Sequence, residues 1–177
     1  MKLGYLLACF FLVMVCGCGY RTGSLLPDAD IHTVYVKNFR NDTFNIKIRR
    51  VNKTSQLGIE TKLTDEIIRR FMLDGTLKVT AKENADVVLE GRIISFSLSP
   101  RQFDSTDRRL VAQYAVRIGV ELTLIDSATG EIIWVDDIEK GATYFITGSL
   151  ARSEEDAVDE ASAELARDIV IRVVEGW

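Results

Sequence analysis

The side chains with the greatest capacity for covalent or metal chemistry are three cysteines and one histidine, and their positions limit that chemistry. Cys9, Cys16 and Cys18 all lie within the first 18 residues, and the single histidine is His32. Cys16 and Cys18 form a C-x-C pair, but a zinc site needs further thiolates or imidazoles, and no second cysteine pair follows. The rest of the sequence therefore has no disulfide framework, no thiolate nucleophile and no cysteine-based zinc site.

The other polar residues do not predict a catalytic site. Asp136 and Asp137 are neighbours in a predicted strand, where consecutive side chains point to opposite faces and cannot easily share a proton. Glu154 and Glu155 fall in the first turn of a predicted helix, where acids complement the helix dipole. The sequence has no glycine-rich phosphate loop, and its net charge of −4 does not indicate a nucleic-acid binder. We therefore predict no enzyme activity, no catalytic residue, no metal and no cofactor.

The N-terminal residues have the pattern of an export signal. Lys2 is the only charge before Arg21, and the ten residues from Leu6 to Val15 are all apolar. Such a run is shorter than the ~20 residues that a helix needs to cross a bilayer, although a short membrane anchor is the alternative. Small residues follow the run. We predict a signal peptide over residues 1–17.

The end of this segment resembles the signal of bacterial lipoproteins, in which a small residue precedes a modified cysteine. Gly17 stands directly before Cys18, whereas the bulkier Val15 precedes Cys16. The resemblance implies cleavage before Cys18, with lipid attached to its thiol and to the new amine. It also implies an outer-membrane destination on the periplasmic side, because Gly19 follows the cysteine in place of an aspartate. Several acyl chains are sufficient for stable anchoring. Residues 18–30 are then a lipidated tether.

The first half of the remaining chain alternates between strand and helix patterns. Residues 31–39 predict a strand, and residues 44–50 predict either a short edge strand or an amphipathic loop. Apolar residues at every fourth position predict a helix over 56–74, ended by Gly75 in a left-handed cap. Residues 85–99 predict a long strand with a bulge around Gly91, where the alternation changes phase.

The second half begins with the most regular pattern of the sequence. After a charged connection over 100–109, apolar residues occupy the even positions from Leu110 to Leu124, which predicts a strand with one buried face. Residues 132–148 run back as its antiparallel partner, and residues 153–175 predict a helix capped by Ser153 and Asp156. The expected order is β-α-β-β-β-α. It predicts one α+β domain over 31–177, a two-layer sandwich with two helices on one face of a mostly antiparallel four-stranded sheet.

Two basic clusters and one strand face are candidate contact surfaces. The clusters fall on predicted connections and consist of Lys47, Arg49, Arg50 and Lys53, and of Arg101, Arg108 and Arg109. Ordinary solvated loop charge is one interpretation. Contact with phosphates of lipid headgroups or lipopolysaccharide is the other. On the wet face of the long hairpin, Arg117 and Glu121 are further candidates for a partner surface.

The order and spacing of several short motifs resemble the LptE family of lipopolysaccharide-assembly lipoproteins. These motifs are VYVKNFRNDT, LTDEIIRRF, ADVVLEGRI, IDSATGEIIW and DEASAELARDIV. The resemblance implies two helices on a four-stranded sheet, an outer-membrane location, and a role as partner and plug of the β-barrel LptD. Lipopolysaccharide is then the cargo. The stretch from Phe44 to Ser55 is longer than the family leads us to expect.

A second group of lipoproteins shares some of the same motifs. CsgG-like secretion proteins and LpoB-like activators of peptidoglycan synthases also combine a phenylalanine, an asparagine and a threonine after the first strand with a later AD-x-V-L-x-G. Here these residues are Phe39, Asn41 and Thr43, and the segment from Ala85 to Gly91. This resemblance implies a periplasmic regulator or secretion component, which is the alternative to lipopolysaccharide assembly.

Overall fold

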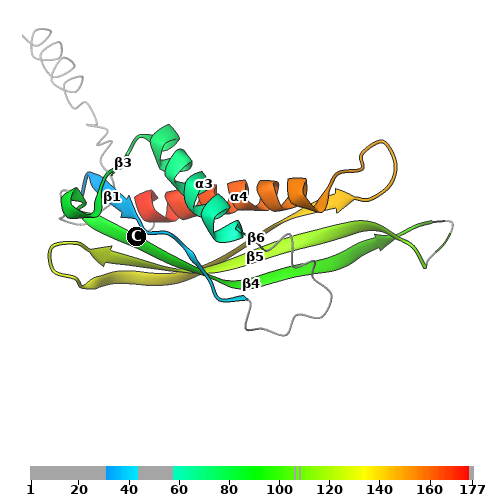
Figure 1. Ribbon diagram of the computed structural model, residues 1–177, viewed down its shortest axis with the longest axis horizontal. Coiled ribbons are helices and arrows are strands. Elements are labelled where there is room, and N and C mark those ends of the chain that lie inside the picture. Colours follow the sequence, from blue (N-terminus) through cyan, green and yellow to red (C-terminus); the bar gives the residue numbers. More distant parts are fainter. Residues whose placement is uncertain (1–30, 44–57, 106, 108, 176–177) are drawn as a thin grey trace, which may run out of the picture.

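The computed structural model describes residues 31–43, 58–105, 107, 109 and 110–175. A long twisted sheet forms one layer, and two helices lie on one of its faces (Figure 1). The predicted α+β class and the arrangement of two helices on one face are confirmed. In chain order the elements are β1 (Thr33–Val36), β2 (Arg40–Asn41), α3 (Ile59–Asp74), β3 (Lys78–Val79), the 3-10 helix η2 (Lys82–Asn84), β4 (Val87–Phe103), β5 (Val111–Asp126), β6 (Ile132–Phe145) and α4 (Glu154–Glu175).

The sheet is mixed and six-stranded, so the prediction of a mostly antiparallel four-stranded sheet is wrong in detail. Its strand order is β3-β1-β4-β5-β6, and β2 also pairs with β4. The long strands β4, β5 and β6 are antiparallel, whereas β1 and β2 run parallel to β4, and β3 runs parallel to β1. Helix α3 connects β1 to the later strands, and such a crossover returns the chain in its original direction. The two strands that the sequence pattern does not predict, β2 and β3, have only two residues each.

The β4–β5 hairpin confirms the alternating pattern over most of its length. Along β5, five even-numbered residues face the helices and are almost fully buried: Val116, Ile118, Val120, Leu122 and Leu124. Leu110, predicted to share this face, precedes the first residue of β5 and is 60% exposed. Strand β4 continues to Phe103, so residues 100–103 belong to the sheet and not to the predicted connection.

Strand β4 has an irregularity close to the predicted bulge, but a few residues past Gly91. The register of β4 against β5 shifts between Ile93 and Ser95, while Gly91 stays in regular register opposite Leu122. A Cβ atom at position 91 would lie 2.1 Å from Cε1 of Phe39, so only glycine leaves room for this ring. Phe39 is 3% exposed. The glycine thus accommodates a buried aromatic side chain at the crossing of the β1–β2 connection and β4.

Helix α3 packs as its sequence predicts. Ile59, Leu63, Ile67 and Phe71 form its buried stripe, which fills the space above the sheet with apolar side chains. Gly75 has φ 77°, and its N–H donates to the carbonyl of Phe71, as expected of a left-handed cap. Residues 56 and 57 of the predicted helix, and the predicted segment 44–50, lie outside the described residues.

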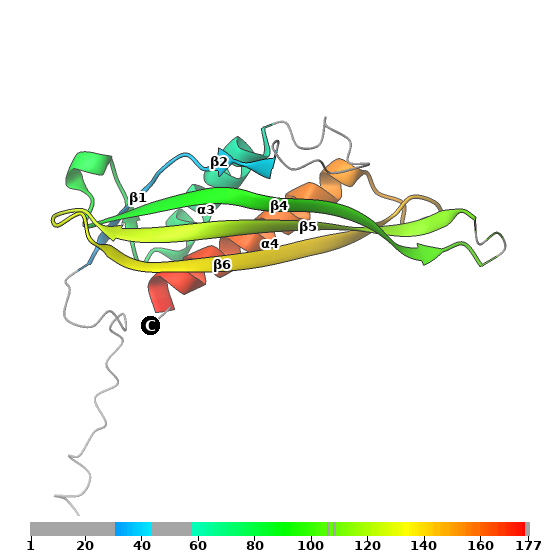
Figure 2. The same cartoon turned by 90° about the horizontal axis from the view of Figure 1, so that it is seen from below.

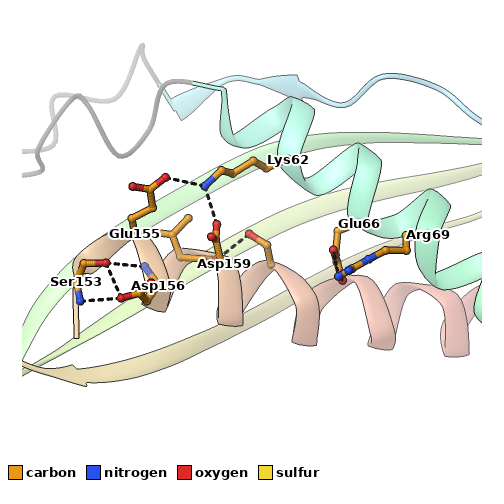
Figure 3. A network of polar contacts seen from close by, with 9 residues as sticks. Lys62, Glu66, Arg69, Ser153, Glu155, Asp156 and Asp159 are labelled. Carbon is orange, nitrogen blue, oxygen red and sulfur yellow. Dashed lines mark hydrogen bonds and ion pairs between the residues drawn. The ribbon is translucent and has the colours of Figure 1, made fainter. Parts of the chain in front are cut away.

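Helix α4 begins with the predicted capping box. The hydroxyl of Ser153 accepts from the N–H of Asp156 at 3.0 Å, and the Asp156 carboxylate accepts from the N–H of Ser153 at 3.0 Å (Figure 3). The same hydroxyl donates to this carboxylate, and these bonds lower the pKa of Asp156. Beside this start, Lys62 of α3 reaches Glu155 at 3.2 Å and Asp159 at 2.7 Å, so ion pairs connect the two helices (Figure 3).

Candidate functional site: the hairpin tip and the open sheet face

The β4–β5 hairpin extends past the helices and ends in a free tip (Figures 1 and 2). We call the described residues of 100–111 the hairpin tip. Arg101 and Arg109 both lie here and are exposed, so the structure brings two of the predicted basic residues to one end of the molecule. The third member of that cluster, Arg108, lies outside the described residues.

Hydrogen bonds of the backbone and of two aspartates hold the hairpin tip together. The N–H of Asp104 donates to the carbonyl of Leu110 at 2.8 Å, and the N–H of Leu110 donates to the carbonyl of Asp107 at 2.9 Å. The two aspartate side chains accept from backbone amides, Asp104 from Asp107 at 3.1 Å and Asp107 from Arg109 at 3.0 Å. Such side-chain contacts are typical of Asp in turns. The carboxylates are thus engaged with the turn backbone.

Apolar side chains accompany the arginines at this end. Phe103 is 50% exposed and Leu110 is 60% exposed. The loop between β6 and α4 adds Ile146, which is 44% exposed and whose N–H donates to the carbonyl of Ala112 at 3.2 Å. Guanidinium groups bind phosphates, while exposed apolar side chains favour contact with hydrocarbon. This combination suits an amphiphilic anion.

Sequence reasoning found the charge of the hairpin tip but missed its apolar part. The alternating pattern predicts that Leu110 is buried, and the charged segment 100–109 predicts no role for Phe103. A phenylalanine within the polar segment PRQFDSTDRR was the available signal. Which apolar residues stay uncovered depends on where the helices stop, and the alternating pattern does not encode that.

Arg117 lies apart from the hairpin tip. It belongs to the open face, by which we mean the sheet face opposite the helices, because it alternates with the buried Val116 and Ile118. Its guanidinium pairs with Glu139 of β6 at 3.5 Å. Its predicted companion Glu121 lies on the same face, directly opposite Arg92 of β4. The structure therefore separates Arg117 from Arg101 and Arg109.

The open face contains a polar hollow of about 230 Å³ beside Arg92. Arg92 forms two hydrogen bonds with Glu121, at 2.7 and 2.9 Å, and reaches Asp42 at 3.5 Å. The hydrogen bond from Arg92 lowers the pKa of Glu121, while that pairing raises the pKa of Arg92. Lys37 pairs with Glu90 at 2.6 Å. The cations Arg92 and Lys37 are already paired with carboxylates. The hollow is therefore a weaker binding site for an anion than the hairpin tip.

The predicted anchor and the first basic cluster, Cys18, Lys47, Arg49, Arg50 and Lys53, lie outside the described residues. Within the part of the chain that the structure describes, no group of three or more histidine, cysteine, aspartate or glutamate side chains could hold a metal ion. Among the same residues, no helix is both long and apolar enough to span a membrane.

Comparison with known proteins supplies a family and a set of fold relatives. A family described as LptE, lipopolysaccharide-assembly, matches residues 31–173. No curated protein matches the sequence.

Solved structures with the same fold have low sequence identity. The hypothetical protein CT253 from Chlamydia trachomatis has a TM-score of 0.57 and 14% identity, covering 81% of this chain and 95% of its own. Protein XCC0632 from Xanthomonas campestris has a TM-score of 0.56 and 16% identity, covering 81% and 84%. Uncharacterized lipoprotein B from Nitrosomonas europaea has a TM-score of 0.53 and 12% identity, covering 81% and 83%. These structures are similar to this chain in fold.

Proposed function

This chain belongs to the LptE family of lipopolysaccharide-assembly proteins, and from that membership we propose that it is an outer-membrane lipoprotein that assists lipopolysaccharide delivery. Its partner in this proposal is the β-barrel LptD, which it joins and plugs from the periplasmic side. The observation that carries the proposal is the family match over residues 31–173, which includes the six strands of the sheet, helix α3 and all but the last two residues of α4. That match favours lipopolysaccharide assembly over the synthase-activator and secretion alternative.

The cargo surface in this proposal is the hairpin tip. Arg101 and Arg109 supply cations for the phosphates of lipopolysaccharide, and Phe103 and Leu110 supply apolar area for its acyl chains. No bond is made or broken in this role, and the protein acts by binding alone.

The anchor in this proposal is Cys18, which carries the lipid. Labelled palmitate fed to cells that produce the full chain tests this assignment. We expect label on the wild-type protein and on a Cys16→Ser variant, and loss of label from a Cys18→Ser variant. Label that persists on Cys18→Ser would refute the assignment.

A pull-down tests the partner. The tagged full-length chain is purified in mild detergent from its own membranes, and the co-purifying proteins are identified by mass spectrometry. We expect a large outer-membrane barrel in stoichiometric amount. Recovery of a peptidoglycan synthase, or of a ring of copies of this chain, would overturn the proposal in favour of the alternative family role.

Matched arginine variants test the cargo surface. An Arg101→Ala/Arg109→Ala double variant should bind purified lipopolysaccharide about tenfold more weakly, because two phosphate contacts are lost. Arg117→Ala is the control, since Arg117 pairs with Glu139 on the open face, and it should bind as the wild type does. Equal binding by the double variant and the wild type would remove the hairpin tip from the mechanism.

A further inference from the structure

Strand β6 lies along one edge of the sheet (Figure 2). Within the described residues it pairs along its length with β5 only, whereas the outer side of β4 is partly covered by β1 and β2. Such an edge exposes a row of backbone N–H and C=O groups, which can pair with another strand. β6 has 14 residues, so this row is long.

The hydrogen bonds at one end of β6 reveal which backbone groups point outward. The N–H of Ile146 donates inward to the carbonyl of Ala112, at 3.2 Å. The carbonyls of Phe145 and Thr143 accept from Arg152 on the outer side, at 2.9 and 3.0 Å. Because inward and outward residues alternate in an antiparallel pair, the outward groups upstream belong to Val135, Asp137, Glu139 and Gly141.

The same end shows that the edge accepts a further segment. Ala151 forms a parallel bridge with Phe145, beside the two bonds that Arg152 makes. This short contact uses the edge only at residues 143–145. The stretch 132–142, which we call the free edge, continues from it without interruption. It contains no proline, the residue that commonly blocks such edges.

Several charged side chains of β6 are held by ion pairs within the molecule. Asp136 receives a 2.6 Å hydrogen bond from Arg172 of α4, and Lys140 lies 2.5 Å from Asp168 of the same helix. These two side chains are therefore held over the helix-covered face. On the open face, Glu139 turns inward to Arg117 of β5.

The side chains that stay at the free edge are apolar or acidic. Ile132 is 62% exposed, Val135 is 55% exposed and Ile133 is 36% exposed. Asp137 lies two residues from Val135 on the open face, and its outward N–H donates to Asp136 Oδ1 at 2.9 Å. An incoming strand must compete with that bond, so its pairing relies chiefly on Val135, Glu139 and Gly141.

We propose that the free edge of β6 accepts an extended strand from a partner protein. The partner strand carries a lysine or arginine opposite Asp137 and, two residues away, an aliphatic side chain opposite Val135. Backbone hydrogen bonds supply the affinity of such strand addition, and alternate side chains supply the specificity. The inference goes beyond the proposed function, since it requires neither lipopolysaccharide nor the lipid anchor.

Charge distinguishes this partner from a second copy of the chain. The antiparallel register in which residues 132–142 overlap themselves fully is centred on Asp137. It would place Asp137 opposite Asp137 of the second copy. Like charges directly opposite each other destabilise a strand pair. A partner with a cation at this position turns that repulsion into attraction.

A synthetic strand tests the proposal on the purified full-length chain. The probe is a blocked peptide of about nine residues in which lysine and valine take turns at every second position, with threonine between them, so that lysine and valine lie two residues apart on one face. Its control replaces each lysine with glutamate. We expect the lysine peptide to slow hydrogen exchange at the amides of Val135, Glu139 and Gly141 and to leave the inward amide of Ile138 unchanged. Absence of this protection, or equal protection by the glutamate peptide, would overturn the proposal.

Backbone and side-chain variants separate the contributions. Glu139→Pro removes an outward N–H and leaves the backbone hydrogen bonds to β5 in place, although it loses the ion pair with Arg117. It should weaken binding of the lysine peptide about tenfold. Glu139→Gln keeps the N–H and is the matched control, with binding close to that of the wild type. Asp137→Lys should reverse the preference in favour of the glutamate peptide, and an unreversed preference would contradict the charge assignment.

Light scattering of the chain without peptide tests the second copy. We expect no dimer that depends on the free edge. A concentration-dependent dimer that Glu139→Pro abolishes would replace the partner strand with a second copy and overturn the proposal.

Discussion

Phe39 and Phe103 mark two regions in which the same side chain has opposite surroundings. Phe39 is 3% exposed, lies against Gly91 and has its backbone N–H bonded to the hydroxyl of Thr64 at 3.0 Å. Phe103 is 50% exposed at the hairpin tip, past the end of the helices. The first region is built to hold the helix layer on the sheet, and the second is left open to other molecules.

This contrast explains why the motif of Phe39, Asn41 and Thr43 carries little information about function. Phe39, Asn41 and Thr43 form a structural unit, since the Asn41 side-chain carbonyl accepts from both the N–H and the hydroxyl of Thr43, at 3.1 and 2.6 Å. Thr43 is 2% exposed. Such residues specify a fold, and function must be sought where side chains stay uncovered.

The largest expected effect separates the two phenylalanines. Phe39→Ala should lower the free energy of unfolding by about 3–5 kcal/mol, because it leaves a cavity above Gly91. Phe103→Ala should change it by no more than about 0.5 kcal/mol, as is usual for exposed positions. Urea denaturation of both variants measures the difference. Equal losses would show that the hairpin tip is part of the core and would break the comparison.

The next effect tests the contact inside the buried region. Gly91→Ala should cost about 1–3 kcal/mol, because the added Cβ would lie 2.1 Å from the ring of Phe39. In a Phe39→Ala background the same substitution should cost much less, since the ring is gone. Denaturation of the single and double variants gives the coupling energy. Additive losses would contradict the contact.

Local patterns explain which parts of the fold could be predicted. The stripe from Ile59 to Phe71 and the even positions from Val116 to Leu124 both record burial directly in their periodicity. The strands β2 and β3 have two residues each, and their pairing depends on contacts with distant parts of the chain. The register shift of β4 lies a few residues past the position that the pattern predicts. The packing of Gly91 against Phe39 is not predictable for the same reason as these strands, because Phe39 is far away in sequence.

Only the basic residues of the candidate site could be predicted from the sequence. Arg101 and Arg109 stood out within a polar segment, and the structure places both at the hairpin tip. The exposure of Phe103 and Leu110 follows from where the helices end. Which backbone N–H and C=O groups of β6 point outward depends on how β6 pairs with β5. The pattern of side chains along the sequence does not reveal this pairing. Basic side chains are therefore predictable from sequence, and uncovered apolar groups and strand edges need the structure.

A smaller, pH-dependent effect concerns the end of the sheet opposite the hairpin tip. Asp86 Oδ2 accepts from the hydroxyl of Thr33 at 2.7 Å, from its N–H at 2.8 Å, and from the N–H of His32 at 2.9 Å. These bonds, that from the Thr33 hydroxyl foremost, lower the pKa of Asp86 below its ordinary value of 3.8. A lowered pKa means that the folded state favours the carboxylate, so Asp86 stabilises the fold above pH 3.8 and loses this contribution as pH falls through the lower folded value.

The variant Asp86→Asn tests this linkage. Its deficit in unfolding midpoint relative to the wild type should be larger at about pH 7 than at about pH 3, because protonation removes the wild type's advantage. Urea denaturation at both pH values measures the two deficits. A deficit that is the same at both values would show that Asp86 does not bind β1 through its charge.

The smallest expected effect on stability is at the hairpin tip itself. Replacing Arg101 and Arg109 by alanine should change the free energy of unfolding by no more than about 0.5 kcal/mol, because the two arginines are exposed. The same double variant should bind lipopolysaccharide about tenfold more weakly. Denaturation and lipopolysaccharide titration on one preparation test both statements. A variant that loses stability and binding together would mean that the arginines support the fold. A variant that loses only binding would mean that the two arginines contact lipopolysaccharide, which is the role expected of exposed side chains at the hairpin tip.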